Sequence, residues 1–309
     1  MRLNEQAAGV FIICVTPFTE DGALDLPSAE RMVEFYLERG ATGLTVLGMM
    51  GEAPKLTMAE SLTFVDCVLK CVAGRVPVVV GVSGPGLASM AELSAAVMAS
   101  GAAGVMVAPP SNLRSDAQIR SYFSQVAQAI GMDTPFVLQD FPLATTVMIS
   151  TATIIQIVAD NPNCVMLKHE DWPGLNKITE LRSAQASGAM RPISILVGNG
   201  GIFLPEELAR GVDGAMTGFA FPEMMADVYH AYSSGDAERA RDLFDAYLPL
   251  ARYEQQPGFG LAVRKYVLAK RGAIGSATLR APAPKLSAAD IADIEGLIER
   301  QTRRLEELS

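Results

Sequence analysis

Short apolar runs alternate with longer amphipathic stretches along the whole chain, and this alternation is its main structural signal. The apolar runs are rich in valine, isoleucine and leucine, as buried parallel strands are. Between them, apolar positions recur at helical spacing, often after a polar capping residue. The predicted strands are 9–16, 43–47, 76–82, 104–108, 135–140, 164–170, 193–197 and 214–217. The predicted helices are 26–38, 58–72, 87–100, 116–130, 151–159, 174–187, 203–210 and 222–232.

Strict alternation of strand and helix predicts parallel strands joined by crossover helices. Eight such units over about 230 residues fit an α/β fold of the (β/α)8 TIM barrel type, which typically takes about 250 residues. The alternative is an open doubly wound sheet, which usually carries a glycine-rich fingerprint after its first strand. Residues 17–22 are not such a fingerprint, so the barrel is the better prediction.

The last part of the chain is predicted to form three additional C-terminal helices, at 237–250, 260–270 and 287–308. No shift in composition and no flexible linker separates them from the preceding units. We therefore predict a catalytic barrel over 1–234 and a helical appendix over 235–309. The appendix is expected to pack on the barrel as part of the same structural unit.

The composition narrows the functional classes. Half of the residues are hydrophobic, 19% are charged and the net charge is −9, so nucleic acid and anionic membranes are not expected partners. No apolar run approaches the length of a membrane span, and the first residues lack a secretory pattern. Cys14, Cys67, Cys71 and Cys164 are best explained as buried thiols, which favours a cytoplasmic protein.

The chain has only two histidines, His169 and His230. A three-histidine metal site is therefore impossible, and we predict no metal and no cofactor. The G-x-S-x-G elbow of many serine hydrolases is absent from the sequence.

The candidate chemistry centres on Lys168, which ends the apolar run 164–170. A charged amine at the end of a buried strand is costly unless it has a task. Burial lowers the pKa of a lysine and makes a neutral, nucleophilic amine available, as a Schiff-base lysine requires. An isolated lysine at a strand end more often reaches to solvent, so the prediction depends on the neighbouring residues.

In a (β/α)8 barrel the active site is built at the C-terminal ends of the strands. Lys168 and Glu170 are two residues apart on one strand and point the same way, and Gln139 ends the neighbouring strand at a similar height. Glu170 is then a candidate base, or else a simple ion-pair partner of Lys168. Gln139 either contacts the substrate in the catalytic site or only fills space. Its amide can act as neither an acid nor a base. His169 points the other way and is expected to pack between strand and helix.

Several motifs together resemble the class I, pyruvate-type Schiff-base lyases, the family that includes dihydrodipicolinate synthase and N-acetylneuraminate lyase. They are Val15-Thr16-Pro17-Phe18, the loop Gly48-x-x-Gly51-Glu52, Pro142, Lys168 and Gly198. The resemblance covers nearly the whole chain, including the C-terminal helices. It implies that Lys168 forms a Schiff base with a 2-oxo acid and that the Gly48 to Gly51 loop binds the substrate carboxylate through its backbone N–H groups. It also implies a homotetramer, a dimer of dimers.

The chain departs from the synthase and from the sialic acid lyase at their hydroxyl relay. The middle positions of the loop carry hydroxyl residues in those enzymes and are Met49 and Met50 here. Gln139 stands at the position of their strand-five tyrosine. The synthase's second tyrosine matches about Ser111, and its substrate-binding arginine falls at Ala144. Dihydrodipicolinate synthesis is therefore disfavoured.

The pattern is more similar to the 2-keto-3-deoxy sugar acid dehydratases, such as L-2-keto-3-deoxyarabonate dehydratase. That branch resembles the chain in Gln139-Asp140-x-Pro142, in Lys168-x-Glu170 and in the segments 214–218 and 248–250. The methionine pair departs from this branch as well. The candidate catalytic residues are Lys168, Glu170 and Gln139, and the candidate substrate-binding residues are Gly48, Met49, Met50, Gly51, Gly198, Asn199 and Met216.

These features predict a Schiff-base dehydratase that acts on a 2-keto-3-deoxy sugar acid or a similar 2-oxo acid. In this hypothesis the iminium at Lys168 acidifies C3, Glu170 removes the C3 proton, and the C4 hydroxyl leaves. If the C4 carbon left instead, the protein would be a pyruvate-dependent aldolase or a synthase-like lyase. The alternative from another class is a non-catalytic 2-oxo acid binding protein, because the relay is missing. A phosphate-binding barrel enzyme has only the glycine-rich segment 198–201 in its support.

Overall fold

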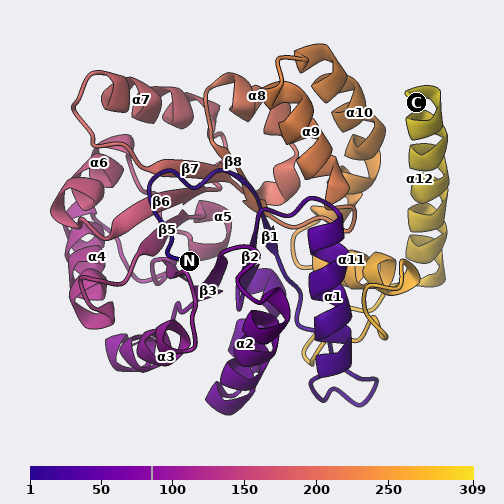
Figure 1. Cartoon of the computed structure of the whole chain (residues 1–309), viewed down its shortest axis with the longest axis horizontal. Coiled ribbons are helices and arrows are strands. Elements are labelled where there is room, and N and C mark those ends of the chain that lie inside the picture. The colour runs from indigo at the N-terminus through magenta and orange to yellow at the C-terminus, as the bar shows by residue number, and fades with distance from the viewer. Residues whose placement is uncertain (85) are drawn as a thin grey trace.

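The computed structural model describes residues 1–84 and 86–309, and within them eight parallel strands close into a barrel in chain order (Figure 1). This confirms the predicted (β/α)8 barrel. Most strands are one to three residues shorter than predicted, because the ladder ends where the chain turns into the loops at either end of the barrel. The strands are β1 (Gly9–Ile13), β2 (Gly43–Val46), β3 (Val78–Gly81), β4 (Gly104–Val107), β5 (Phe136–Asp140), β6 (Cys164–His169), β7 (Ser194–Val197) and β8 (Gly214–Thr217).

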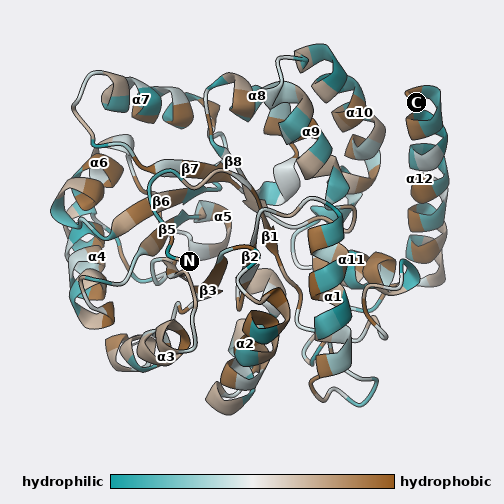
Figure 2. Ribbon diagram, in the orientation of Figure 1, coloured by the Kyte–Doolittle hydropathy of each residue, from teal (hydrophilic) through white to brown (hydrophobic). Residues whose placement is uncertain are grey.

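Helices follow the strands and surround the barrel, with their apolar sides turned toward it (Figures 1 and 2). They are α1 (Leu26–Glu38), α2 (Met58–Val72), α3 (Leu87–Ala99), α4 (Asp116–Ile130), α5 (Pro142–Thr145), α6 (Thr151–Asp160), α7 (Leu175–Ala186), α8 (Leu204–Ala209) and α9 (Glu223–Ser233). Short 3-10 turns η1 (Met49–Gly51), η2 (Ala53–Lys55) and η3 (Asn199–Gly201) lie at the mouth. The starts of α2 and α4 are fixed by capping boxes at Thr57 and Ser115.

Side chains from the strands fill the barrel below the site. Met166 of β6 and Val137 of β5 belong to this interior cluster and are fully buried, as is Met216 of β8. Leu3 joins them, and its N–H donates to the carbonyl oxygen of Ala103 just before β4. The N-terminal segment thus covers the end at which the strands begin. Alternation along β6 then places Lys168 inward, one layer above Met166.

Three helices follow the barrel and lie beside α9 and α1 (Figure 1). They are α10 (Ala237–Glu254), α11 (Gly260–Lys270) and α12 (Ala288–Glu307). Buried Phe244, Val267 and Ile294 from these helices belong to the same apolar cluster as the residues between barrel and outer helices. The first helix was predicted to end at residue 250, but it runs one turn further. Pro249 removes one helical donor, and the following residues still bond in helical register.

The surface and the thiols bear on the remaining predictions. Cys14 and Cys164 are buried, whereas Cys67 and Cys71 on α2 are only partly buried, which corrects the prediction for that pair.

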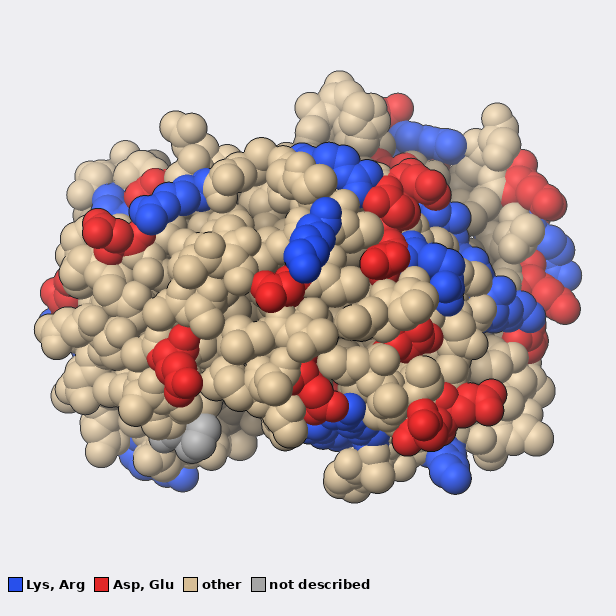
Figure 3. Space-filling model, turned by 60° about the horizontal axis from the view of Figure 1, so that its bottom comes forward, with Lys and Arg blue, Asp and Glu red and all other residues tan. Residues whose placement is uncertain are grey.

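Among the described residues, no helix combines the length and the apolar character that a bilayer crossing requires. On the face shown in Figure 3, positive and negative side chains of the described chain are interspersed and form no continuous basic patch.

Candidate active site at the barrel mouth

Lys168, Glu170 and Gln139 converge at the C-terminal end of the barrel. Lys168 pairs in register with Gln139 across β5 and β6. Its Nζ lies 3.0 Å from Oε1 of Glu170, and Nε2 of Gln139 donates to the same oxygen at 2.7 Å. All three side chains are buried, so these contacts form away from bulk water. The expected meeting of an amine, a carboxylate and an amide is therefore present in the structure.

Glu170 is held by backbone contacts on both sides of its strand. Its N–H donates to the carbonyl oxygen of Asp140 at 2.8 Å, and its own carbonyl oxygen accepts from Nδ2 of Asn199 at 3.1 Å. Gly198 lies directly beside its side chain, because a Cβ there would overlap the Glu170 carboxyl group. Gly198 and Asn199 therefore both contact Glu170.

A cavity of about 90 Å³ opens over Lys168. The cavity exceeds the roughly 10–15 Å³ that one buried water needs, so it can admit water or the keto-acid end of a small substrate. The predicted site residues that line it are Met49, Met50, Gln139, Lys168, Glu170 and Asn199. Gly48, Gly51 and Gly198 are not part of this lining, and Met216 lies in the apolar interior of the barrel. A hollow of about 930 Å³ between α1 and α2 contains none of these residues.

The loop after β2 is folded by its own hydrogen bonds. The N–H of Gly51 donates to the carbonyl oxygen of Gly48 at 3.0 Å, and Oγ1 of Thr16 donates to the carbonyl oxygen of Gly51 at 2.6 Å. The Gly51 N–H that was expected to bind a carboxylate is thus engaged within the loop. Met49 and Met50 line the cavity with thioether side chains, and no hydrogen bond among the described residues engages their backbone N–H groups.

Glu52, the last residue of the loop motif, lies outside the cavity. It is buried and forms ion pairs with Lys265 at 2.7 Å and with Lys55 at 2.9 Å. It also accepts from the backbone N–H of Arg280 at 3.0 Å. Burial lowers the pKa of Lys265 to about 8, although the Glu52 carboxylate acts in the opposite direction. Glu52 therefore ties the mouth loop to the C-terminal part of the chain.

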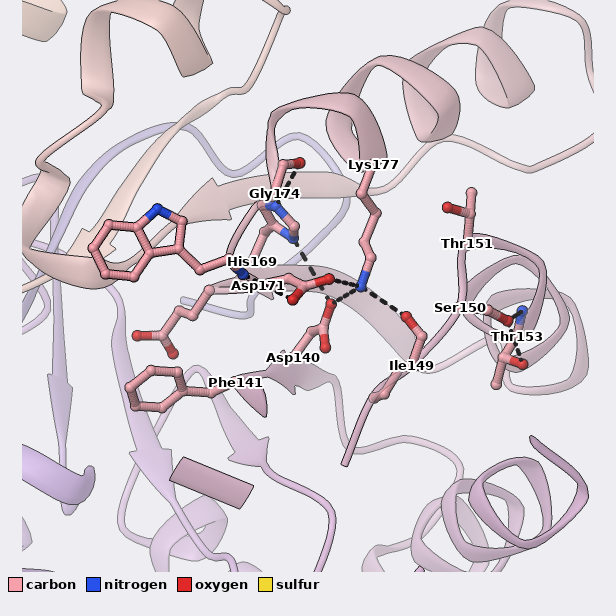
Figure 4. A network of polar contacts seen from close by, with 12 residues as sticks. Asp140, Phe141, Ile149, Ser150, Thr151, Thr153, His169, Asp171, Gly174 and Lys177 are labelled. Carbon is pink, nitrogen blue, oxygen red and sulfur yellow. Dashed lines mark hydrogen bonds and ion pairs between the residues drawn. The ribbon is translucent and has the colours of Figure 1, made fainter. Parts of the chain in front are cut away.

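A second buried polar network lies on the helix side of β5 and β6 (Figure 4). Nζ of Lys177 from α7 lies 2.8 Å from Asp140 and 2.5 Å from Asp171. His169 packs there as predicted: its Nε2 lies 3.1 Å from the Gly174 carbonyl oxygen and its Nδ1 3.8 Å from Asp140. Burial acts to lower the pKa of Lys177, but the two carboxylates outweigh it and raise that pKa. Strand alternation separates this network from the cavity.

The glycine-rich segment after β7 gives little support to a phosphate site. The N–H of Gly200 donates to Oγ1 of Thr217 at 2.8 Å, so this donor is already engaged. Gly200 has a positive φ of 67°, and a Cβ there would overlap the Gln255 side chain. The glycine is explained by this close approach.

Two lining residues from the appendix were missed by sequence reasoning. They are Gln255, just after α10, and Arg264 of α11. The sequence signal for the second was weak: Arg264 and Lys265 stand side by side in an otherwise apolar helix, and both are buried. Next to these residues, Glu254 is buried and pairs with Arg264, whereas the Tyr253 hydroxyl contacts Asp290 and Asp293 on α12.

The fold and the site together define a (β/α)8 barrel protein with a buried lysine–glutamate pair at its mouth. A family model, that of the dihydrodipicolinate synthetase family, matches residues 6–301, and the chain belongs to that family. An L-2-keto-3-deoxyarabonate dehydratase from Azospirillum brasilense is 30% identical over 282 residues, 90% of this chain and 89% of that protein. A 4-hydroxy-tetrahydrodipicolinate synthase from Erythrobacter litoralis is 30% identical over 257 residues, 82% of this chain and 85% of that protein.

Solved structures agree with this assignment. A crystal structure of dihydrodipicolinate synthase from Rhodopseudomonas palustris is 51% identical, with a TM-score of 0.95 over 97% of this chain and 99% of that one. YagE, a prophage protein of the same family from E. coli K12, was crystallised in complex with pyruvate. It is 25% identical, with a TM-score of 0.86 over 96% of this chain and 98% of that one. The family resemblance noted from the sequence motifs is thus confirmed.

Proposed function

We propose that this protein is a Schiff-base dehydratase that removes water from a 2-keto-3-deoxy sugar acid or a similar 2-oxo acid. The observation that carries the proposal is the shared contact of Lys168 and Gln139 with one oxygen of Glu170 beside a small cavity. The similarity to a protein named as a 2-keto-3-deoxyarabonate dehydratase supports the substrate class.

The first step is the formation of the Schiff base. A proton that passes from Nζ of Lys168 to Glu170, across 3.0 Å, leaves a neutral amine. The amine nitrogen attacks the C2 ketone and forms a carbinolamine. The carbinolamine hydroxyl then leaves as water, with its proton supplied by Glu170, and an iminium remains at C2. Glu170 is again a carboxylate at the end of this step.

The second step is the loss of the C4 hydroxyl. Glu170 takes a proton from C3, and the electron pair of that C–H bond moves into the iminium to give an enamine. The enamine then pushes its electron pair into a new C3=C4 double bond, and the C4–O bond breaks. The hydroxyl takes the proton held by Glu170 and leaves as water. Hydrolysis of the resulting conjugated iminium regenerates Lys168 and releases the product, so one water is lost overall. Gln139 keeps the carboxylate in place and exchanges no proton itself.

A carbon–carbon lyase is the second candidate, because several relatives carry the name of the synthase. In that case the enamine would attack an aldehyde. In the reverse direction the C4 hydroxyl would lose its proton, the electron pair of the C3–C4 bond would move into the iminium to give the enamine, and an aldehyde would leave. The lining speaks against the synthase. Gln139 and the methionines offer no phenol or hydroxyl for a proton relay, and Ala144 is no carboxylate-binding residue. The homotetramer, the cytoplasmic location and the division at 234/235 remain predictions.

Borohydride trapping tests the proposal. The protein is incubated with pyruvate or with 2-keto-3-deoxy sugar acids, reduced, and mapped by mass spectrometry. We expect an adduct on Lys168 with each acid, and loss of water from the sugar acids when borohydride is omitted. A retro-aldol product would instead favour the carbon–carbon lyase. A folded protein that gives no adduct with any 2-oxo acid would overturn the Schiff-base proposal and favour the binding protein.

A further inference from the structure

Gln255 brings an amide group to the barrel mouth from the C-terminal helices. It directly follows α10 and lines the cavity over Lys168. The preceding residue, Glu254, is buried, pairs with Arg264 at 2.6 Å and accepts from the backbone N–H of Ala220 at 3.0 Å. The chain is therefore anchored at the point from which the Gln255 side chain extends to the mouth.

The Gln255 side chain lies across Gly200. A Cβ on Gly200 would overlap Nε2 and Cδ of Gln255, so the glycine leaves the space that the amide occupies. Gly200 also lines the cavity, and Gly198, two residues before it, lies beside the Glu170 carboxyl group. The segment after β7 thus connects Glu170 with the amide of Gln255 along one wall of the site.

This amide is not committed to the protein. Among the described residues that line the cavity, Gln255 is the one polar side chain that makes no hydrogen bond and no ion pair. Neither its oxygen nor its nitrogen is sealed off from solvent. Arg264 differs, because Glu254 and the Gly218 carbonyl oxygen engage two of its nitrogens and the third is buried against Gly218. A free amide at a cavity can donate to a hydroxyl group or accept from one.

The proposed reaction accounts for the first four carbons of a sugar acid and leaves the fifth without a partner. C2 is bonded to Lys168, and Glu170 acts at C3 and C4. The backbone N–H groups of Met49 and Met50 are free for the carboxylate. C5 is the first carbon whose hydroxyl none of these groups binds, and the wall beyond Glu170 leads to Gln255.

We propose that Gln255 is a specificity-determining residue whose amide forms a hydrogen bond with the C5 hydroxyl of the sugar acid bound at Lys168. The inference rests on the proposed function and narrows its substrate class. Preferred substrates then carry a hydroxyl on C5 beside the leaving hydroxyl on C4. An acid without the C5 hydroxyl loses this bond, so the site discriminates against it.

The test removes the hydroxyl from the ligand and the amide from the protein, separately and together. Borohydride trapping on Lys168 is measured over a range of concentrations of 2-keto-3-deoxypentonate, of its 5-deoxy analogue 4-hydroxy-2-oxopentanoate, and of pyruvate. The first two are used racemic at C4, so that the result does not depend on configuration. The wild type should trap the pentonate at a half-saturating concentration about 3- to 10-fold lower than that of the analogue, the usual effect of one neutral hydrogen bond.

Gln255→Leu should raise the half-saturating concentration of the pentonate by the same 3- to 10-fold factor. The values for the analogue and for pyruvate should change by less than about twofold, because neither has a C5 hydroxyl to lose. Gln255→Ala removes the amide without filling its space and should act on the pentonate as leucine does. Circular dichroism checks that each variant is folded.

Gln256→Leu is the matched control. This glutamine is next in the chain and exposed, and its Nε2 donates to the carbonyl oxygen of Tyr253, but it does not line the cavity. It should leave all three half-saturating concentrations unchanged.

The outcomes separate the two proposals. If the wild type traps no 2-oxo acid, the proposed function fails. If the wild type traps all three acids and both Gln255 variants trap the pentonate equally well, the function stands and the role of Gln255 is overturned. An equal loss with the pentonate and its analogue would also overturn a hydroxyl contact. A loss in Gln255→Leu that is absent in Gln255→Ala would do the same, because leucine would then only block the mouth.

Discussion

Nζ of Lys168 lies 3.0 Å from Oε1 of Glu170, and each residue is 5% exposed. The pair can therefore exchange a proton out of contact with bulk water, which links the nucleophile to the base of the proposed reaction. It also means that neither charge is tolerated alone. Removing one partner of a buried ion pair typically costs about 3–5 kcal/mol.

Two substitutions of Lys168 separate these roles. Lys168→Arg keeps a cation beside Glu170 but removes the nucleophilic amine, so we expect a folded protein that gives no borohydride adduct. Lys168→Ala should also give no adduct and, in addition, lose about 3–5 kcal/mol of unfolding free energy in urea at neutral pH. An adduct in the arginine variant, on any other lysine, would contradict the assignment of the nucleophile.

Glu170→Gln tests the base. Because the Schiff base can form slowly without it, we expect pyruvate still to be trapped on Lys168 after long incubation. Exchange of the pyruvate C3 protons for deuterium in D2O, followed by NMR, should slow by about 10²- to 10⁴-fold, the usual contribution of a general base. Exchange at the wild-type rate would show that Glu170 is only an ion-pair partner.

Gly198→Ala also tests whether Glu170 is the base, because it changes the space beside the Glu170 side chain. The added Cβ would overlap the carboxyl group of Glu170 and displace it, while φ at this residue is −111°, outside the positive range that favours glycine. Slower C3 exchange with retained trapping is therefore expected here too. Gly86→Ala is the control, because a Cβ there meets nothing within 4 Å.

The chain pattern predicted the fold well for physical reasons. Strand and helix periods differ, and the strict alternation leaves few topologies, so the eight strands and most helix bounds agree with the structure. Lys168, Glu170 and Gln139 could be placed together because strand alternation and neighbouring strand ends determine their direction. Local sequence was sufficient for these residues.

Arg264 could not be placed in the same way. Its position depends on where α10 ends, on the reversal between α10 and α11, and on the empty space at Gly218. The prediction that α10 ends at residue 250 left Glu254 outside the helix, so the Glu254–Arg264 pair was not apparent. Glu52 likewise belongs to a motif visible in the sequence, but its partner Lys265 is 213 residues away.

Lys177 should matter for stability and much less for chemistry. Lys177→Met leaves Asp140, which is fully buried, without its closest cation, and we expect a loss of about 3–5 kcal/mol in urea unfolding. Lys177→Arg keeps the charge and should recover much of this loss. Trapping per folded molecule should stay near the wild-type level in both variants, since the network lies on the helix side of the strands. A folded Lys177→Met protein without an adduct would instead link this network to the site.

Glu207 on α8 gives a prediction about pH. Its Oε2 is buried without a hydrogen-bond partner among the described residues. Burial raises the pKa of this carboxyl group to about 8, and the charge of the neighbouring Glu206 acts in the same direction. A carboxyl whose pKa is higher in the folded protein than in the unfolded chain favours folding only while it is protonated. Its contribution is complete below the unfolded pKa, about 4.3, and is lost as the pH rises through 8.

Glu207→Gln removes this dependence, so it should be more stable than the wild type above pH 8, by up to about 5 kcal/mol, at about 1.4 kcal/mol for each pKa unit. The gain should shrink as the pH falls and disappear near pH 4, which urea unfolding at pH 4.5, 6, 7.5 and 9 would follow. Glu299→Gln, at an exposed position on α12, is the control and should change stability by less than about 0.5 kcal/mol at each pH. A gain that is the same at every pH would mean that the carboxyl group of Glu207 does not titrate in this range. In that case the stabilisation would come from packing or from a new amide hydrogen bond.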